Sequence, residues 1–122
     1  MVSDHSETML ALMKEQAQEA YEMQARLLVA VFGSVQDELA VLLWFLCQRF
    51  GRKTRVGLQL EPRLPVRLLA DLLGRSRQRV NEAILAFQAQ GWIDRRYGQI
   101  VIKDLERLRE RAQPFLELAG GG

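Results

Sequence analysis

The sequence contains few of the residues that build disulfide frameworks, metal sites or histidine-based active sites. Among 122 residues there is one Cys, Cys47, and one His, His5. A single Cys excludes an intrachain disulfide, and its place in the apolar run of residues 40–47 is typical of a buried structural thiol. No pairing of nucleophile and base and no set of metal ligands stands out. We therefore expect a protein without enzymatic activity, cofactor or metal.

Long apolar runs and a leader sequence are also missing. The longest apolar run covers residues 39–47, whereas a membrane-spanning helix needs about 20 residues. Asp4 and Glu7 lie near the N-terminus, where a secretion signal would carry cations before an apolar stretch. The expected location is the cytoplasm.

Charge is divided unevenly along the chain, although the overall net charge is only +2. Residues 1–48 carry a net charge of −5, whereas residues 49–99 contain eleven Lys or Arg against four acids, a net charge of +7. Ten of those eleven cations are Arg, whose planar fork suits phosphate and guanine. Such a block indicates a surface that binds a polyanion, or alternatively an ordinary solvated face.

A long helix is predicted over residues 6–32, which lack Pro and Gly and are rich in strong helix formers. Small and apolar side chains recur along it every three or four residues and form one narrow stripe. Pairing with the same helix of a second subunit would bury this stripe, whereas packing on its own domain would not use the whole length. We therefore predict a homodimer. The predicted dimerisation residues are Leu10, Met13, Ala17, Ala20, Gln24, Leu27 and Val31.

The next segment is predicted to form the core of a small domain. Gly33 and Ser34 break the first helix, and Ser34 is placed to cap a second, almost wholly apolar helix over residues 35–50. A polar, basic stretch at residues 52–55 follows, and the alternation at residues 56–60 predicts a strand. Pro62 and Pro65 end the extended structure.

Residues 66–102 carry the pattern that points to function. Four leucines and Ala70 predict a short helix that ends at Gly74, and Ser76 is placed to cap a second helix over residues 77–90. Two helices joined by a short turn with Gly form a helix-turn-helix, in which Val80 packs against the first helix. Gly91 ends the second helix, and residues 92–102 predict a β-hairpin, the wing.

The predicted fold is therefore mainly α with a small β wing: a long dimerisation helix, then a winged helix-turn-helix. The expected divisions are residues 6–32, residues 33–104, and a C-terminal helix with a frayed tail at 105–122. The expected partner is double-stranded DNA, because the second helix of this motif enters the major groove. Base contacts are predicted for Arg77, Gln78, Arg79 and Asn81. Phosphate contacts are predicted for Arg95, Arg96, Arg75, Arg52, Lys53 and Ser76.

A protein-interaction module is the alternative. Winged helices also bind proteins, so the chain could form a heterodimer with a longer relative or bind another protein, with weak DNA contact.

The run of residues 31–104 resembles the C-terminal half of the Crp/Fnr family of bacterial transcription regulators, and the preceding helix resembles that family's dimerisation helix. The resemblance implies a regulator that binds a pseudo-palindromic DNA site. It is carried by the segments Phe32-Gly33-Ser34-Val35-Gln36-Asp37-Glu38-Leu39-Ala40, Gln48-Arg49-Phe50-Gly51-Arg52, Leu69-Ala70-Asp71-Leu72-Leu73-Gly74-Arg75-Ser76-Arg77, Val80-Asn81 and Gly91-Trp92-Ile93.

The second helix departs from the pattern that the resemblance implies. Arg77 keeps the family's guanine-contacting position, whereas Gln78 replaces a Glu and Glu82 replaces a base-contacting Arg. Pro65 stands where a Ser or Thr usually caps the first helix. The family's half-site therefore does not transfer to this chain. Few residues precede the long helix, so the family's cyclic-nucleotide-type sensor is not expected. With a single Cys in the chain, the family's iron–sulfur cysteine cluster is not expected either.

Overall fold

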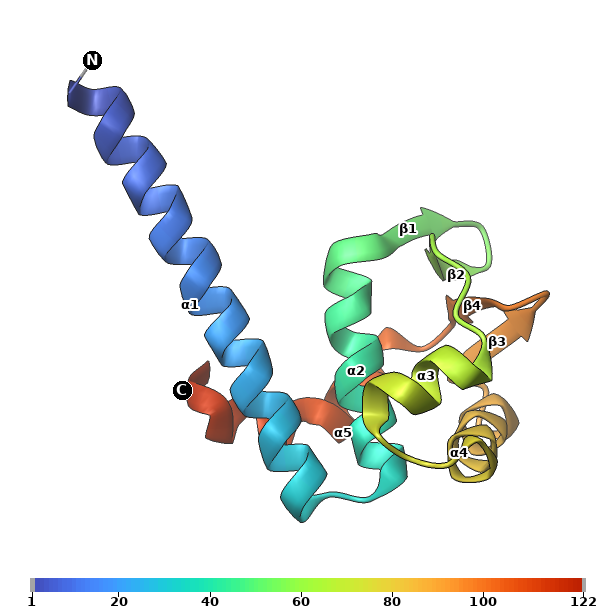
Figure 1. The fold of residues 1–122 in the computed structure, drawn as a ribbon. Coiled ribbons are helices and arrows are strands. Elements are labelled where there is room, and N and C mark those ends of the chain that lie inside the picture. Colours follow the sequence, from blue (N-terminus) through green and yellow to red (C-terminus); the bar gives the residue numbers. More distant parts are fainter. Residues whose placement is uncertain (1, 122) are drawn as a thin grey trace.

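A computed structural model describes residues 2–121, with side chains described for residues 5–120. Helices make up most of it, and four short strands form one sheet (Figure 1). In chain order the elements are α1 (Val2–Phe32), α2 (Val35–Phe50), β1 (Gly51–Thr54), β2 (Gly57–Leu60), α3 (Val66–Leu73), α4 (Arg77–Ala89), β3 (Ile93–Arg96), β4 (Gln99–Ile102), α5 (Leu105–Leu116) and a final turn, η1 (Glu117–Gly121).

The break between α1 and α2 is held by a reciprocal cap. Ser34 Oγ accepts a hydrogen bond from the backbone N–H of Asp37 at 3.2 Å, and Asp37 Oδ2 accepts one from the backbone N–H of Ser34 at 2.9 Å. This capping box satisfies two donors that the start of a helix otherwise leaves unpaired. The cap predicted at Ser34 and the helix over residues 35–50 are confirmed.

The main core lies where α2 meets α3, α4 and the sheet. Leu39 and Leu43 of α2, Phe87 of α4 and Ile100 of β4 are all completely buried within it. Phe87 also packs on Trp92, with ring centroids 5.1 Å apart. Because α2 supplies one side of this core, the apolar sides of the short helices are covered and their polar sides are left exposed.

The antiparallel sheet has the strand order β1-β2-β4-β3, so the wing hairpin β3–β4 joins an earlier hairpin, β1–β2. The strand expected at residues 56–60 is present as β2, whereas β1 was not expected. Arg52 and Lys53 lie in β1, which is an exposed edge strand and therefore lacks an apolar alternation that would reveal it. These two cations belong to a strand and not to the polar linker that the sequence suggests.

A second apolar cluster joins α1 to its own domain. Ala25 and Val29 of α1, Phe45 of α2 and Ala112 of α5 are buried together, and Ala119 of η1 is also buried there. α5 and the turn after it are thus packed on α1 and α2. The frayed tail expected at the C-terminal glycines stays a prediction, and Gly122 lies outside the described residues. Ala119 holds this turn against the cluster. A single Ala near the end of a chain gives little indication in the sequence that it is buried.

Only the second half of α1 takes part in that cluster. From His5 to Ala20 every described side chain is exposed, and the helix extends away from the domain (Figure 1). The N-terminal half therefore makes none of the intrachain packing that the alternative interpretation of the helix requires.

Asp37 gives the fold a measurable pH dependence. Burial alone would raise its pKa, but hydrogen bonds from the Ser34 backbone N–H and from Arg111 lower that pKa below its ordinary value. The stabilisation is then complete above the unfolded-state pKa, near pH 4, and is lost as the pH falls through the lower folded-state pKa. We expect Asp37→Asn to lower the free energy of unfolding at pH 7 by about 1 kcal/mol.

Urea denaturation between pH 2 and pH 7 measures this effect. In the Asp37→Asn variant, the fall in stability below pH 4 should become shallower. The matched control is Asp71→Asn, at an exposed residue of α3. An equally steep acid limb in wild type and Asp37→Asn would contradict the assignment.

Candidate nucleic-acid interface

The turn between α3 and α4 has the geometry that the sequence predicts. Gly74 ends α3 with φ at 65°, a left-handed conformation that favours Gly, and its N–H donates to Ala70 O and Asp71 O. Ser76 Oγ then caps α4 by accepting from the backbone N–H of Arg79 at 3.2 Å. Pro65 precedes α3 without any side-chain cap, as expected.

Small and branched side chains fix the crossing of the two helices. Ala70 of α3 is buried, and Val80, Ala83 and Ile84 of α4 are buried on one side of that helix. The opposite side of α4 is therefore turned outward. Two helices that cross in this way, with one side of the second helix exposed, form a helix-turn-helix.

The outward side of α4 carries the predicted base-contacting residues. Arg77, Gln78 and Asn81 are all exposed, and Gln78 Nε2 donates to Glu82 Oε1 at 3.4 Å. We call Arg77, Gln78, Asn81 and Glu82 the reading face. It presents donors and amide groups that match base edges in a major groove, together with one carboxylate that repels phosphate.

Arg79 borders the reading face on the side of Glu82. It lines a shallow polar hollow of about 400 Å³ between α4, the start of α2 and α5, together with Ser34, Gln36, Glu82 and Arg111. The contact of Arg79 with a base stays a prediction, and its position beside the N-terminus of α2 suits a phosphate equally well.

The wing ends in a two-residue turn at Tyr97 and Gly98. Their φ angles of 53° and 79° are both left-handed, as in the turns that best match the twist of a hairpin. Tyr97 is 90% exposed at the tip. Arg95 is half-buried, whereas Arg96 is exposed and lies 3.6 Å from Asp94. The hairpin and its basic tip are confirmed as structure.

Arg63 belongs to the wing tip, although the sequence analysis did not select it. Its Nη1 donates to Tyr97 O at 3.2 Å, and the neighbouring Leu64 N–H donates to Gly98 O at 2.8 Å. The loop before α3 thus supports the tip. The hydrogen bond joins residues 34 positions apart, so no local pattern predicts it. The only hint in the sequence was a cation between Pro62 and Pro65.

Besides Arg96, which pairs with Asp94, three more predicted phosphate contacts have other partners. Arg75 binds the buried Glu38 through two hydrogen bonds of 2.9 and 2.6 Å, and its Nη2 also donates to Ala30 O at 3.4 Å. Arg52 pairs with Glu61 at 2.9 Å, and Ser76 Oγ is used by the cap. Arg75 therefore acts as a structural tie between α2 and the turn, and its contact with a phosphate stays a prediction. The sequence alone does not reveal the Glu38 partner, which lies 37 positions away.

The described residues offer little for other kinds of chemistry. They contain no group of three or more His, Cys, Asp and Glu able to hold a metal. Cys47 is buried, and this burial raises the pKa of its thiol to about 12. Within residues 2–121, no helix combines the length and the apolar character needed to cross a membrane.

Comparison with known proteins assigns the domain. The sequence family described as the Crp-like helix-turn-helix domain matches residues 39–111, which include α3, α4 and the wing. The chain belongs to the Crp-like helix-turn-helix family. It is 31% identical over 112 residues to the CRP-like cAMP-activated global transcriptional regulator of Mycobacterium tuberculosis. That match covers 92% of this chain and 50% of the relative, so the chain spans about half the length of the curated relatives that it matches.

Solved Crp-like structures share the fold. A CooA variant from Carboxydothermus hydrogenoformans superposes with a TM-score of 0.73 at 24% identity, covering 90% of this chain and 50% of that one. A CRP/FNR-family transcriptional regulator from Thermus thermophilus also gives 0.73, at 23% identity, covering 88% and 55%. The long helix before the helix-turn-helix is part of the shared arrangement. The chain thus carries the DNA-binding domain of a Crp-like transcription regulator.

Glu82 is the residue of the reading face whose charge opposes DNA binding. Glu82→Gln removes the carboxylate and keeps the side-chain shape. We expect affinity for a random-sequence duplex to rise about fivefold, which corresponds to roughly 1 kcal/mol for one unit charge near a phosphate in a watery interface. Fluorescence anisotropy at one fixed salt concentration measures it.

Glu19→Gln, at an exposed position of α1, is the matched control for loss of a negative charge. Equal gains in both variants would mean that net charge, and not the position of Glu82, sets the affinity.

Proposed function

We propose that the chain is a sequence-specific transcription regulator that binds double-stranded DNA as a homodimer on a pseudo-palindromic site. The observation that carries the proposal is the exposed reading face of a capped, well-packed α4 in a Crp-like domain. The basic wing supports it, because α4 and the β3–β4 hairpin both lie on the side of the domain away from α1 (Figure 1).

Each group of residues has a distinct role in this proposal. Arg77, Gln78 and Asn81 contact base edges in the major groove, where Arg pairs with guanine and an amide pairs with adenine. Arg95, Arg96, Arg52 and Lys53 contact phosphates, fix the register and make the affinity depend on salt. Arg79 extends the contact beside them.

The exposed stripe on α1 supports the homodimer. Leu10, Met13, Leu27 and Val31 are each more than half exposed, and Ala17, Ala20 and Gln24 continue the same stripe. Burying these side chains against a second copy removes apolar surface from water. A two-fold dimer then presents two α4 helices to half-sites about 34 Å apart, one turn of DNA.

Selection from random duplexes at near-physiological salt tests the whole proposal. We expect a two-fold-symmetric motif with half-sites one helical turn apart. The motif should differ from the family's, because Gln78 and Glu82 alter the reading face. Recovery of no motif, with only weak and salt-sensitive binding, would contradict sequence-specific regulation and favour a protein-interaction module.

Two Arg substitutions separate base reading from phosphate binding. Arg77→Ala should relax preference at one position of each half-site, at a cost of about 1–3 kcal/mol, whereas Arg95→Ala should weaken all duplexes alike and lower the salt slope by about 1. Titrations of matched and mismatched duplexes at several salt concentrations measure both, with Lys14→Gln on α1 as control. The roles are wrong if Arg77→Ala leaves sequence preference unchanged and Arg95→Ala abolishes it.

Neighbouring apolar residues on α1 test the dimer. Met13 belongs to the stripe, whereas Leu12 lies off it, and both are more than half exposed. Met13→Asp should raise the dimer dissociation constant by tenfold or more because it places a charge in the seam, and Leu12→Asp should leave it unchanged. Analytical ultracentrifugation measures the constant. A monomeric wild-type protein, or equal effects of both variants, would contradict the assigned seam.

A further inference from the structure

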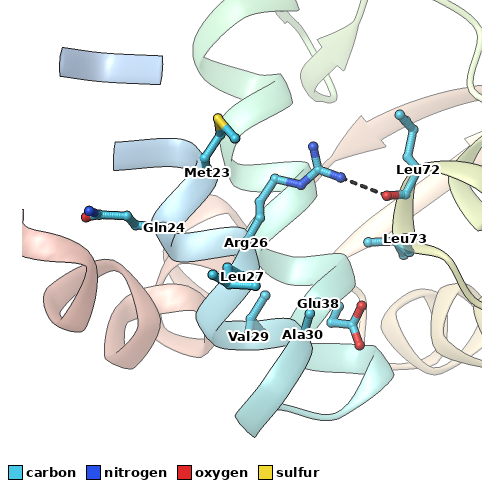
Figure 2. Close-up of a pocket in the computed structure, with 9 residues that line it drawn as sticks. All are labelled: Met23, Gln24, Arg26, Leu27, Val29, Ala30, Glu38, Leu72 and Leu73. Atoms are coloured by element: carbon cyan, nitrogen blue, oxygen red, sulfur yellow. Dashed lines mark hydrogen bonds between the residues drawn. The ribbon is translucent and has the colours of Figure 1, made fainter. Parts of the chain in front are cut away.

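A cavity of about 540 Å³ lies between the second half of α1 and the end of α3 (Figure 2). Met23, Leu27 and Ala30 of α1 line one wall, and Leu72 and Leu73 of α3 line the other. Met23 is 72% exposed, Leu27 66% and Leu72 40%. These apolar side chains are therefore uncovered in the single chain, at the place where α1 meets the helix-turn-helix.

Two of the three polar or charged residues that line the cavity are already paired within the chain. Arg26 Nη2 donates to Leu72 O at 2.7 Å, which ties α1 to the end of α3 (Figure 2). Glu38 is bound by Arg75. Apart from the Gln24 amide, the uncovered lining of the cavity is thus apolar, and the occupant that it fits is another apolar surface.

The cavity is continuous with the exposed stripe of α1. Leu10, Ala17, Gln24 and Val31 are spaced by seven residues, as are Met13, Ala20 and Leu27, so the stripe follows the a and d positions of a heptad repeat. Gln24 and Leu27 belong both to the stripe and to the cavity lining. Met23 and Ala30 take the g positions, which places the cavity on the g flank of the stripe.

The two flanks of the stripe suit a parallel pair of α1 helices. In such a pair, each g residue lies near the e residue five positions further along the other helix. The resulting pairs are Met9 with Lys14, Gln16 with Tyr21, and Met23 with Leu28, and none joins two like charges. Met23 at the cavity therefore meets Leu28 of the partner subunit.

Leu28 lies beside the C-terminal segment of its own chain. It packs against the cluster that contains Leu116 and Ala119, and Leu118 of the same turn is 69% exposed. The α5–η1 segment thus flanks α1 on the e side, and the cavity flanks it on the g side. In a two-fold parallel pair, the e side of one α1 helix lies beside the g side of the other, at the same level along the helix axis.

We propose that a second copy of the chain closes this cavity, with Leu28 and Leu118 of the partner subunit covering Leu72 and Met23. The inference rests on the homodimer proposed above and extends its interface from the α1 pair to the helix-turn-helix. Leu72 is next to Leu73, the last residue of α3. Dimerisation would therefore fix the position of the helix-turn-helix in each copy as well as join the two copies.

Single charged substitutions test the contact in the full chain. Leu72→Asp and Leu118→Asp should each raise the dimer dissociation constant at least tenfold, because both symmetry-related contacts lose a buried leucine. The Arg26 hydrogen bond to Leu72 O uses the backbone and is retained in the variant. Leu85→Asp is the matched control, an exposed leucine of α4. Circular dichroism and thermal melting of each variant verify that it folds.

A disulfide test uses the same positions in a Cys47→Ala background. Leu72→Cys with Leu118→Cys should give a covalent dimer under mild oxidation, whereas Leu85→Cys with Leu118→Cys should not. A wild-type monomer would contradict the proposed homodimer itself. A wild-type dimer that Met13→Asp weakens, but that keeps its dissociation constant within twofold in Leu72→Asp and Leu118→Asp, would overturn the cavity contact alone.

Discussion

The pairing of Glu38 with Arg75 connects the parts of the molecule on which function depends. Glu38 is 3% exposed in α2, and a buried carboxylate without a partner is strongly destabilising. Arg75, in the turn between α3 and α4, supplies that partner and also donates to Ala30 O of α1. One guanidinium group therefore fixes α1, α2 and the helix-turn-helix relative to one another.

Around this tie, the domain is organised as two apolar clusters with different tasks. The larger one, between α2, α4 and the sheet, turns the polar side of α4 outward. The smaller one, between α1, α2, α5 and η1, sets the direction in which α1 leaves the domain. In the homodimer proposed above, the first cluster determines which side of α4 is presented to DNA, and the second determines how far apart the two α4 helices lie.

Local patterns in the sequence predict most of the fold and part of the site. Gly74, Ser76 and Val80 predict the helix-turn-helix. Each meets a local requirement: Gly74 ends α3, Ser76 caps α4, and Val80 packs between the two helices. The β1 strand was missed because Arg52 and Lys53 lie on an exposed edge and show no alternation. The structural use of Arg75 was missed because its partner Glu38 is remote in the chain. The packed turn at Ala119 was missed for the same reason, since its contacts are with α1.

The position of Ala119 has a consequence for the order of folding. Ala25 and Ala119 share one cluster, although 94 positions separate them in the sequence. Closing so long a loop is entropically costly, and such contacts form late. α1 precedes α2 in the chain, and its buried side has only α2 to pack on until residues 112–119 have followed, so the last turn completes the attachment of the long helix to its domain.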